Sequence, residues 1–317
     1  MLARLQVALV LVWLLAVAWG LHWALQLHAS VLRALGVVAL AVTWHALWLA
    51  LTFALMSWRN RPDAAPKPSR EECLRAWWGE VLAAPRVFAW QQPFRSRALP
   101  DDLAGASASE TDAPKVGVVL VHGFVCNRGL WNPWMKRLRA QGVPYLAVNL
   151  EPVFGVIDDY TTVIEEAVQR VTEATGCAPV IVAHSMGGLA VRAWLRRYQA
   201  DDRVASVVTI GTPHQGTWLA YWGSTPNARQ MKPGGVWLTH LAADEPASRA
   251  RRFVCCFSHC DNIVFPAMTA VLPGARAVLV RAAAHVDMVG RSEVFNEVLV
   301  AIKAAQAVAQ STGARQA

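Results

Sequence analysis

The first sixty residues contain almost no charged side chains. No Asp, Glu, Lys or Arg lies between Arg4 and Arg33, and none lies between Arg33 and Arg59. Each uncharged stretch is longer than the roughly 20 residues that a helix needs to cross a bilayer. Hydrophobic residues make up 55% of the 317-residue chain, which is too high a share for an ordinary soluble domain. Residues 1–59 are therefore predicted to form a membrane anchor of two transmembrane helices.

The first stretch also allows a second interpretation, as a cleaved signal peptide. Ala16-Val17-Ala18 resembles the small-residue site at which such peptides are cut. The apolar character continues past this point to Leu27, however, which favours a transmembrane helix. Tryptophans suited to the membrane interface occur in both stretches, at Trp13, Trp19, Trp23, Trp44, Trp48 and Trp58.

Positive charge is scarce between the two stretches and frequent outside them. Only Arg33 lies in the connection, whereas Arg4 precedes the first stretch. The cations that follow the second stretch are Arg59, Arg61, Lys67 and Arg70. Because positively charged flanks resist translocation, both ends of the chain are expected on the cytoplasmic side.

The six cysteines do not have the spacing of a secreted disulfide scaffold, which is compatible with a reducing compartment. Four potential metal ligands gather at Cys255, Cys256, His259 and Cys260. The pleat of a strand would send Cys255 and Cys256 to opposite faces, and no second pair of ligands has zinc-finger spacing. We therefore expect no metal and no cofactor.

Residues 60–114 are predicted to form a linker between the anchor and the remainder of the chain. Residues 60–70 are rich in Pro, Arg and Lys, and apolar residues at helical spacing predict a short helix over 71–84. Residues 86–97 are expected to add one or two edge strands. The segment 101–115 is rich in Ala, Ser, Asp and Glu and is expected to be a loop.

From residue 116 onward, apolar runs typical of strands alternate with amphipathic segments typical of helices. The expected strands are 116–121, 144–149, 179–184, 204–210, 253–258 and 277–281. The expected helices lie near 130–141 and over 158–174, 186–198 and 291–308. This alternation predicts an α/β domain over 115–317 with a mostly parallel sheet covered on both faces. A chain that starts near Arg70 is accordingly expected to fold and function without the anchor.

Residues 183–188 read Ala-His-Ser-Met-Gly-Gly and directly follow the apolar run 179–182. A serine on a tight turn between a strand and a helix presents its hydroxyl above the sheet edge, and small neighbours two residues away permit that turn. Ala183 and Gly187 supply those small neighbours. Ser185 is therefore a candidate nucleophile.

An oxyanion hole and two triad partners can also be assigned. The strand 116–121 ends in His122-Gly123-Phe124, so the backbone N–H groups of Phe124 and of Met186 are candidate oxyanion donors. Asp261 follows one expected strand and His285 follows the next. The order Ser185, Asp261, His285 is the order of an α/β-hydrolase triad.

Two rival assignments compete with these partners. His214 also follows a strand, and it could replace His285 as the base. Asp287 could replace Asp261 as the acid, but it lies only two residues after His285, where a side-on hydrogen bond is awkward. His122 and His184 flank the functional backbone and are expected to act as buried supports.

Several segments together resemble the small bacterial lipases of the Bacillus subtilis lipase A type, within the α/β-hydrolase superfamily. They are 119–124, the elbow 183–188 with alanine in place of the usual first glycine, Asp261-Asn262-Ile263-Val264, and His285. The run 211–217, Gly-Thr-Pro-His-Gln-Gly-Thr, resembles a segment common in lipases and esterases. The resemblance implies an α/β-hydrolase fold and hydrolysis of carboxylic esters through an acyl-enzyme.

The resemblance covers about residues 115–305, and this chain departs from it in two places. It has the N-terminal membrane region, and it has a longer insert near 216–250 whose aromatic residues suit a cap over an acyl pocket or an ordinary surface excursion. An acyltransferase, a thioesterase or a catalytically silent membrane adaptor remain alternatives. We expect an ester or lipid substrate, no nucleic-acid partner, and a location in the bacterial inner membrane.

Overall fold

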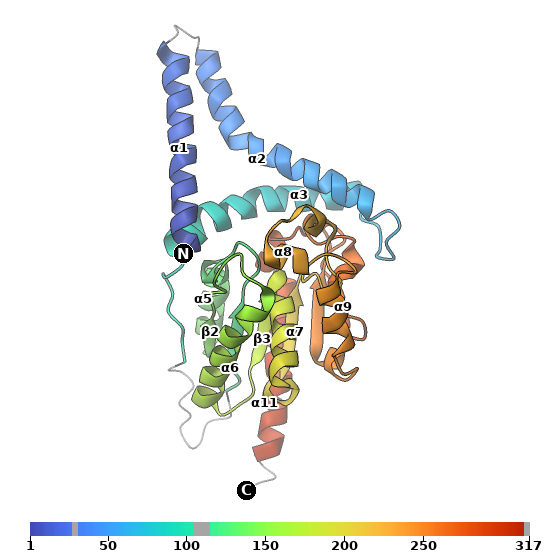
Figure 1. Cartoon of the computed structure of the whole chain (residues 1–317). Coiled ribbons are helices and arrows are strands. Elements are labelled where there is room, and N and C mark those ends of the chain that lie inside the picture. The colour runs from blue at the N-terminus through green and yellow to red at the C-terminus, as the bar shows by residue number, and fades with distance from the viewer. Residues whose placement is uncertain (27–30, 104–114, 314–317) are drawn as a thin grey trace.

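The computed structural model describes residues 1–26, 31–103 and 115–313, and it consists of an α/β domain below a group of N-terminal helices (Figure 1). The α/β domain contains a single six-stranded sheet in the order β2-β1-β3-β4-β5-β6. Its strands are β1 (Val118–Val121), β2 (Tyr145–Ala147), β3 (Val180–His184), β4 (Ser206–Ile210), β5 (Phe253–Phe257) and β6 (Arg276–Leu279). Every pair of neighbouring strands is parallel, as predicted.

Helices cover both faces of this sheet. Helices α6 (Thr161–Thr175) and α7 (Met186–Tyr198) pack on one face, and α5 (Asn132–Ala140) and α11 (Ser292–Gly313) pack on the other. Alternate residues of β1 enter the two cores, because successive side chains of a strand point to opposite faces. The strands and helices predicted from residue 116 onward are thus present, and the carboxyl ends of all strands meet at one edge.

The insert between β4 and β5 is helical and irregular. It contains η6 (Trp218–Trp222), α8 (Pro226–Gln230), α9 (Val236–Ala243) and η7 (Arg249–Arg252). The remaining short helices of this domain are η3 (Arg128–Trp131), η4 (Ile157–Tyr160), η5 (Asp201–Arg203), η8 (Ala267–Ala270) and α10 (Asp287–Gly290). Trp237 and Gln230 of the insert donate hydrogen bonds to Asp158 of η4, which ties the insert to the rest of the domain.

Two apolar helices, α1 (Leu2–Gln26) and α2 (Val31–Arg59), project from the domain (Figure 1). Helix α1 is long and apolar enough to cross a membrane. Helix α2 meets that test only if its segments Leu32–Ala41 and Thr43–Arg59, which meet at 44°, count as one bent span. The crossing of a membrane by both helices stays a prediction.

The start of α1 contacts the α/β domain. The amino group of Met1 pairs with the Glu151 carboxylate at 2.8 Å, and the Gln6 amide donates at 2.9 Å to Gln92, which precedes the domain. Because α2 leads back to the same domain, the two helices form a hairpin, and both ends of this hairpin lie beside the α/β domain.

Helix α3 (Arg70–Pro85) is the expected short helix, and it lies between the hairpin and the α/β domain (Figure 1). Ser69 and Glu72 form a capping box at its start, which satisfies two backbone N–H groups. The expected edge strands over 86–97 are wrong, because the chain continues as the π-helical turn η1 (Arg86–Gln91) and α4 (Gln92–Arg95). The loop predicted over 101–115 lies mostly outside the described residues.

Candidate active site

Ser185 occupies the turn between β3 and α7 in a strained backbone conformation. Its φ and ψ are 54° and −131°, a region that residues with a side chain rarely adopt. The turn is tight because α7 starts against the end of β1, where a methyl group on Gly187 would come within 2.5 Å of the His122 carbonyl oxygen. This geometry explains why a residue without a side chain follows the serine by two positions.

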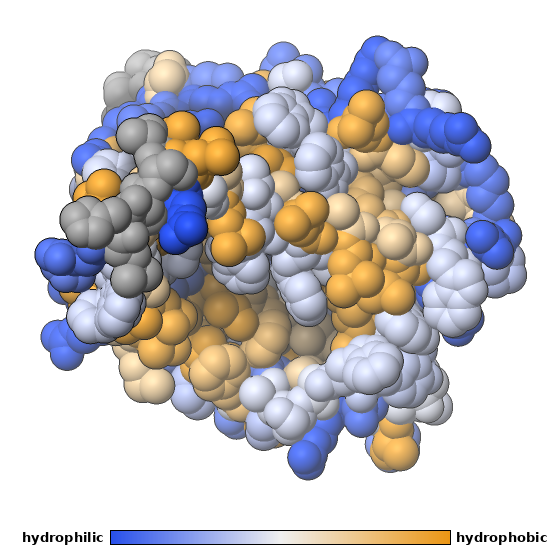
Figure 2. Space-filling model, turned by 90° about the horizontal axis from the view of Figure 1, so that it is seen from above, coloured by the Kyte–Doolittle hydropathy of each residue, from blue (hydrophilic) through white to orange (hydrophobic). Residues whose placement is uncertain are grey.

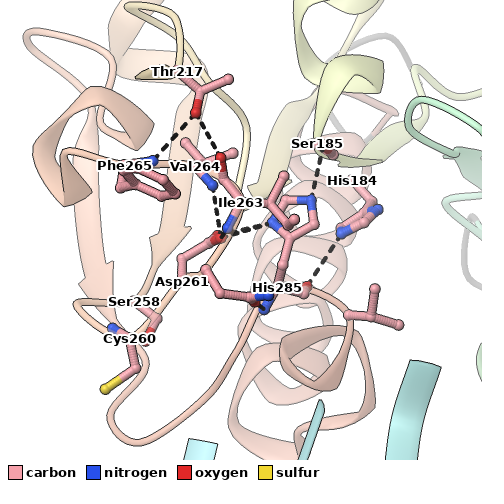
Figure 3. Close-up of polar contacts among 12 residues, drawn as sticks. His184, Ser185, Thr217, Ser258, Cys260, Asp261, Ile263, Val264, Phe265 and His285 are labelled. Carbon is pink, nitrogen blue, oxygen red and sulfur yellow. Dashed lines mark hydrogen bonds and ion pairs between the residues drawn. The ribbon is translucent and has the colours of Figure 1, made fainter. Parts of the chain in front are cut away.

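Three predicted residues from three strand ends meet at this turn (Figure 3). The Nε2 atom of His285 lies 2.9 Å from the Ser185 hydroxyl. On the other side of the ring, Nδ1 lies 3.0 and 2.9 Å from the two carboxylate oxygens of Asp261. All three side chains are buried. The structure therefore brings together the nucleophile, base and acid expected from the sequence.

The Asp261 carboxylate is held in place by backbone groups. Its Oδ1 atom accepts hydrogen bonds from the N–H groups of Ile263 and Val264, at 2.9 and 2.8 Å. Behind the carboxylate lies Gly211, which has a φ of 56° and follows β4. A methyl group there would come within 2.9 Å of Asp261 Oδ2 and 3.1 Å of His285 Nδ1. The absence of a side chain at Gly211 thus allows Asp261 and His285 to pair.

Two opposing influences set the proton affinity of His285. Burial lowers its pKa, and the charge and hydrogen bond of Asp261, together with the charge of Glu80, raise it by more. The net pKa lies above the usual 6.5. A histidine with this environment readily accepts a proton from a neighbouring hydroxyl, since the resulting imidazolium is stabilised by two carboxylates.

Neither rival residue lies at the Ser185–His285 contact. The Nε2 atom of His214 lies 3.1 Å from the Thr209 hydroxyl, and burial lowers the pKa of His214 well below its usual range. The Asp287 carboxylate pairs with Arg291. These contacts favour His285 as base and Asp261 as acid.

The predicted oxyanion loop lies directly beside Ser185. A methyl group on Gly123 would come within 2.7 Å of the Ser185 Cβ atom, so the two backbones are in contact. His122 fixes this loop, because its Nε2 accepts the Leu150 N–H and its Nδ1 lies 2.9 Å from the Gly123 carbonyl oxygen. The roles of the Phe124 and Met186 N–H groups as oxyanion donors stay predictions.

His184 supports the base from the side opposite the carboxylate. Its ring centroid lies 4.6 Å from that of His285, and its Nε2 lies 3.3 Å from the His285 carbonyl oxygen (Figure 3). Burial, followed by the charge of His285, lowers the pKa of His184 well below its usual range. A neutral His184 therefore adds packing beside the base without adding a competing positive charge.

Two buried residues at the site were missed by sequence reasoning. Asn262 accepts the His285 N–H at its side-chain oxygen, and Glu80 of α3 accepts the N–H groups of the two residues after His285. The one available signal was an acidic residue on the apolar face of a short helix. Among the described residues, no group of three or more His, Cys, Asp or Glu side chains could hold a metal ion. All six cysteines are free thiols.

The α/β domain that carries these residues has a fold found in known proteins. Residues 116–252 match the model of the alpha/beta hydrolase fold family. The mature lipase BlEst2 of Bacillus licheniformis has a TM-score of 0.54 and 17% identity, over 62% of this chain and 96% of that one. The same lipase with its propeptide has a TM-score of 0.51 and 17% identity, over 61% of this chain and 52% of that one.

Proposed function

Because the chain contains a domain with the alpha/beta hydrolase fold, we propose that it is a serine hydrolase that cleaves carboxylic esters, as a lipase or carboxylesterase. The observation that carries this proposal is the continuous hydrogen-bonded row of Ser185, His285 and Asp261. The likeness to a bacterial lipase supports the fold, and the row of residues supports the chemistry.

In the first half of the reaction, His285 Nε2 takes the proton of Ser185 as its Oγ atom attacks the ester carbonyl. Asp261 accepts the hydrogen bond of the Nδ1–H and stabilises the imidazolium. The developing oxyanion is held by the N–H groups of Phe124 and Met186. His285 then donates its proton to the departing alcohol, and the acyl group remains on Ser185.

In the second half, His285 removes a proton from water, which attacks the acyl-enzyme. The acid leaves and Ser185 recovers its proton. These steps need no cofactor. The same residues could deliver the acyl group to another acceptor or start from a thioester, so the acceptor and the substrate bond must be measured.

A fluorophosphonate probe tests the proposal, because it labels only an activated serine. The full-length protein should be labelled and should hydrolyse p-nitrophenyl esters, and Ser185→Ala should do neither. Esters of graded chain length then rank the acyl preference. An unlabelled, inactive wild-type protein would identify a silent adaptor, and preferential turnover of thioesters or transfer to an added alcohol would favour the alternative chemistries.

We also propose that the enzyme acts at a membrane through its N-terminal helices. Viewed from above, hydrophobic residues and residues of intermediate hydropathy fill most of the centre of this end of the molecule, and strongly hydrophilic residues lie mostly at its rim (Figure 2). The large apolar residues exposed on α3 are Leu74, Trp78 and Leu82, and those exposed on the α/β domain include Phe154, Trp222 and Val236. An exposed apolar surface of this kind, continuous with two apolar helices, favours contact with lipid.

The side of the membrane follows from charge. Met1 pairs with Glu151 of the α/β domain, so the N-terminus and this domain lie together, and the cations after α2 favour the cytoplasm. A reporter active only in the cytoplasm, fused after Ala317, should be active, and one active only after export should be silent. The reverse pattern would place the domain outside.

A further inference from the structure

A carboxylate outside the row of Ser185, His285 and Asp261 lies buried beside His285. Glu80 belongs to α3, and only 2% of its surface is exposed. Its Oε2 atom accepts the N–H of Val286 at 3.0 Å and the N–H of Asp287 at 2.9 Å. Its Oε1 atom lies 3.2 Å from the Val286 nitrogen. These N–H groups are the first two after His285 and open the short helix α10.

The approach of α3 to this segment is unusually close. A methyl group on Gly79 would come within 2.7 Å of the Asp287 carboxylate, so the helix backbone itself lies against the chain that follows His285. The Asp287 carboxylate, which lies against Gly79, pairs with Arg291, and the Asp287 N–H donates to Glu80. A carboxylate that accepts two backbone N–H groups restrains both peptide units, because charge-assisted hydrogen bonds are short and directional.

We propose that Glu80 is a positioning residue: it fixes the main chain after His285 so that the imidazole faces Ser185 and Asp261 together. This inference rests on the proposed ester hydrolase function. It makes α3 part of the active site, although α3 lies outside the segment that matches the hydrolase family. The base is then held from two directions, by Asp261 at its ring and by Glu80 at its backbone.

Helix α2 supports the same site through its own side chains. The Asn262 amide donates to the Thr52 hydroxyl at 3.2 Å, and the Asn262 oxygen accepts the His285 N–H at 3.3 Å. Asn60, the first residue after α2, donates to the His259 carbonyl oxygen and accepts the Ala267 N–H. The loop that carries Asp261 is thus bonded to α2 just as the segment after His285 is bonded to α3.

A small hydrophobic core reinforces this contact between helices and site loops. It contains residues of α2 and α3 together with residues that flank the acid and the base, namely Phe53, Met56, Ala76, Cys260, Phe265 and Ala284. Cys260 precedes Asp261 and Ala284 precedes His285. The loops that carry Asp261 and His285 therefore both pack on the N-terminal helices next to these residues.

The charge of Glu80 gives the proposal a second, separable consequence. Burial raises the pKa of Glu80 to about 7, and its two backbone hydrogen bonds and the charge of His285 act in the opposite direction. The charged groups that face it are His285, Asp261 and the Asp287–Arg291 pair, and the neutral His184 packs on the far side of His285. Removal of this charge should lower the pKa of His285.

The test uses the full-length protein in detergent and compares Glu80→Ala, Glu80→Asp and Glu80→Gln. Glu71→Gln on the same helix is the matched control, because Glu71 is exposed and pairs only with Arg75 in the contacts shown for it. Three quantities are measured: kcat and KM for a short p-nitrophenyl ester, the rate of fluorophosphonate labelling, and the pH at which kcat/KM falls to half.

We expect Glu80→Ala and Glu80→Asp to lower kcat and the labelling rate by about 10- to 100-fold, since small displacements of a catalytic group have effects of this size, with KM almost unchanged. Glu80→Gln keeps an oxygen that accepts both N–H groups, so its kcat should stay within about threefold of wild type. Its half-activity pH should move lower, which a merely structural residue would not cause. Glu71→Gln should change none of these quantities.

Wild-type kcat in a folded Glu80→Asp variant would overturn the proposal, as would equal losses in Glu80→Gln and Glu80→Asp. If Glu80→Ala does not fold, the Asp and Gln variants alone decide between these outcomes. Failure of the proposed function looks different, because the wild-type protein itself would then neither be labelled nor hydrolyse esters.

Discussion

In the α/β domain, the candidate catalytic side chains follow the ends of strands, and they are positioned mainly by the backbone. Ser185 follows β3, Gly211 follows β4 and Asp261 comes shortly after β5. The N-terminal helices act differently, because single buried side chains of α2 and α3 reach the loops from outside the sheet. The comparison shows that a region with no recognisable catalytic sequence bonds directly to the loops that carry Asp261 and His285.

The two regions also bury their apolar residues in opposite ways. The sheet encloses its valines and isoleucines between two layers of helices, whereas α1 and α2 expose most of their leucines and tryptophans. Outward-facing apolar residues are stable only against another apolar phase, which here is the proposed membrane. Helix α2 therefore has two faces, one that contacts the loops of Asp261 and His285 and one that the proposed membrane would cover.

The largest effects are expected from the strand-end residues themselves. Ser185→Ala and His285→Ala should each lower kcat by roughly 10³-fold or more, and the double variant should lose little further, because the residues act as a unit. Hydrolysis of a short p-nitrophenyl ester measures this, with the exposed His240→Ala as control. Loss of turnover in His214→Ala with near-native His285→Ala would show that the base is misassigned.

The next largest effect should come from removal of α2. A chain that starts at Arg70 retains Glu80 but loses Thr52, Asn60 and the apolar residues of α2 that pack beside the catalytic loops. These contacts revise the expectation of an independent domain, and kcat should fall by about 100-fold. A chain that starts at Val31 keeps these contacts and serves as control. Wild-type turnover of a folded chain from Arg70 would reduce α2 to an anchor.

A third effect concerns pH. A base must be neutral to accept a proton, and the pKa of His285 lies above 6.5, so kcat/KM should fall as the pH drops through a midpoint above 6.5. Asp261→Asn removes the nearest negative charge and should move this midpoint lower while it reduces the rate. A pH–rate profile of both proteins checks the shift, and an unmoved midpoint would mean that another group controls the acid limb.

The smallest effect should follow from Thr52→Val, which deletes one hydroxyl and keeps the side-chain shape. The Asn262 amide then loses its partner in α2, so stability should fall by about 1 kcal/mol and kcat by a few fold. Thr43→Val on the same helix is the control, because the Thr43 hydroxyl bonds only within α2, to Ala39, in the contacts shown for it. Equal stability and equal kcat in the two variants would show that Thr52 does not support the site.

The sequence predicted the strand-end residues because each is marked locally. Ser185 follows an apolar run and is flanked by small residues, and Asp261 and His285 also follow predicted strands. The order of the three along the chain then favoured His285 over His214. Local pattern and order together were enough to specify the geometry that the structure shows.

No such local sequence pattern identifies the residues of α2 and α3 that bond to the site loops. Glu80 and Thr52 are ordinary helical residues until the chain folds back, since their partners come from the last quarter of the sequence. The prediction of edge strands over 86–97 was wrong for a related reason. Val87, Phe88 and Trp90 favour strands, but packing against α1, α3 and the start of the α/β domain keeps the chain helical, and tertiary contacts outweigh such weak preferences.

The bond between Glu80 and Val286 joins residues that are 206 positions apart. During synthesis the N-terminal helices leave the ribosome first, and the segment after His285 is among the last to emerge. Contacts of such long range close late in folding, because the intervening chain must first be ordered. If the hairpin enters a bilayer as proposed, it can do so while the proposed catalytic centre is still incomplete, and ester hydrolysis would then begin only after the enzyme is in place.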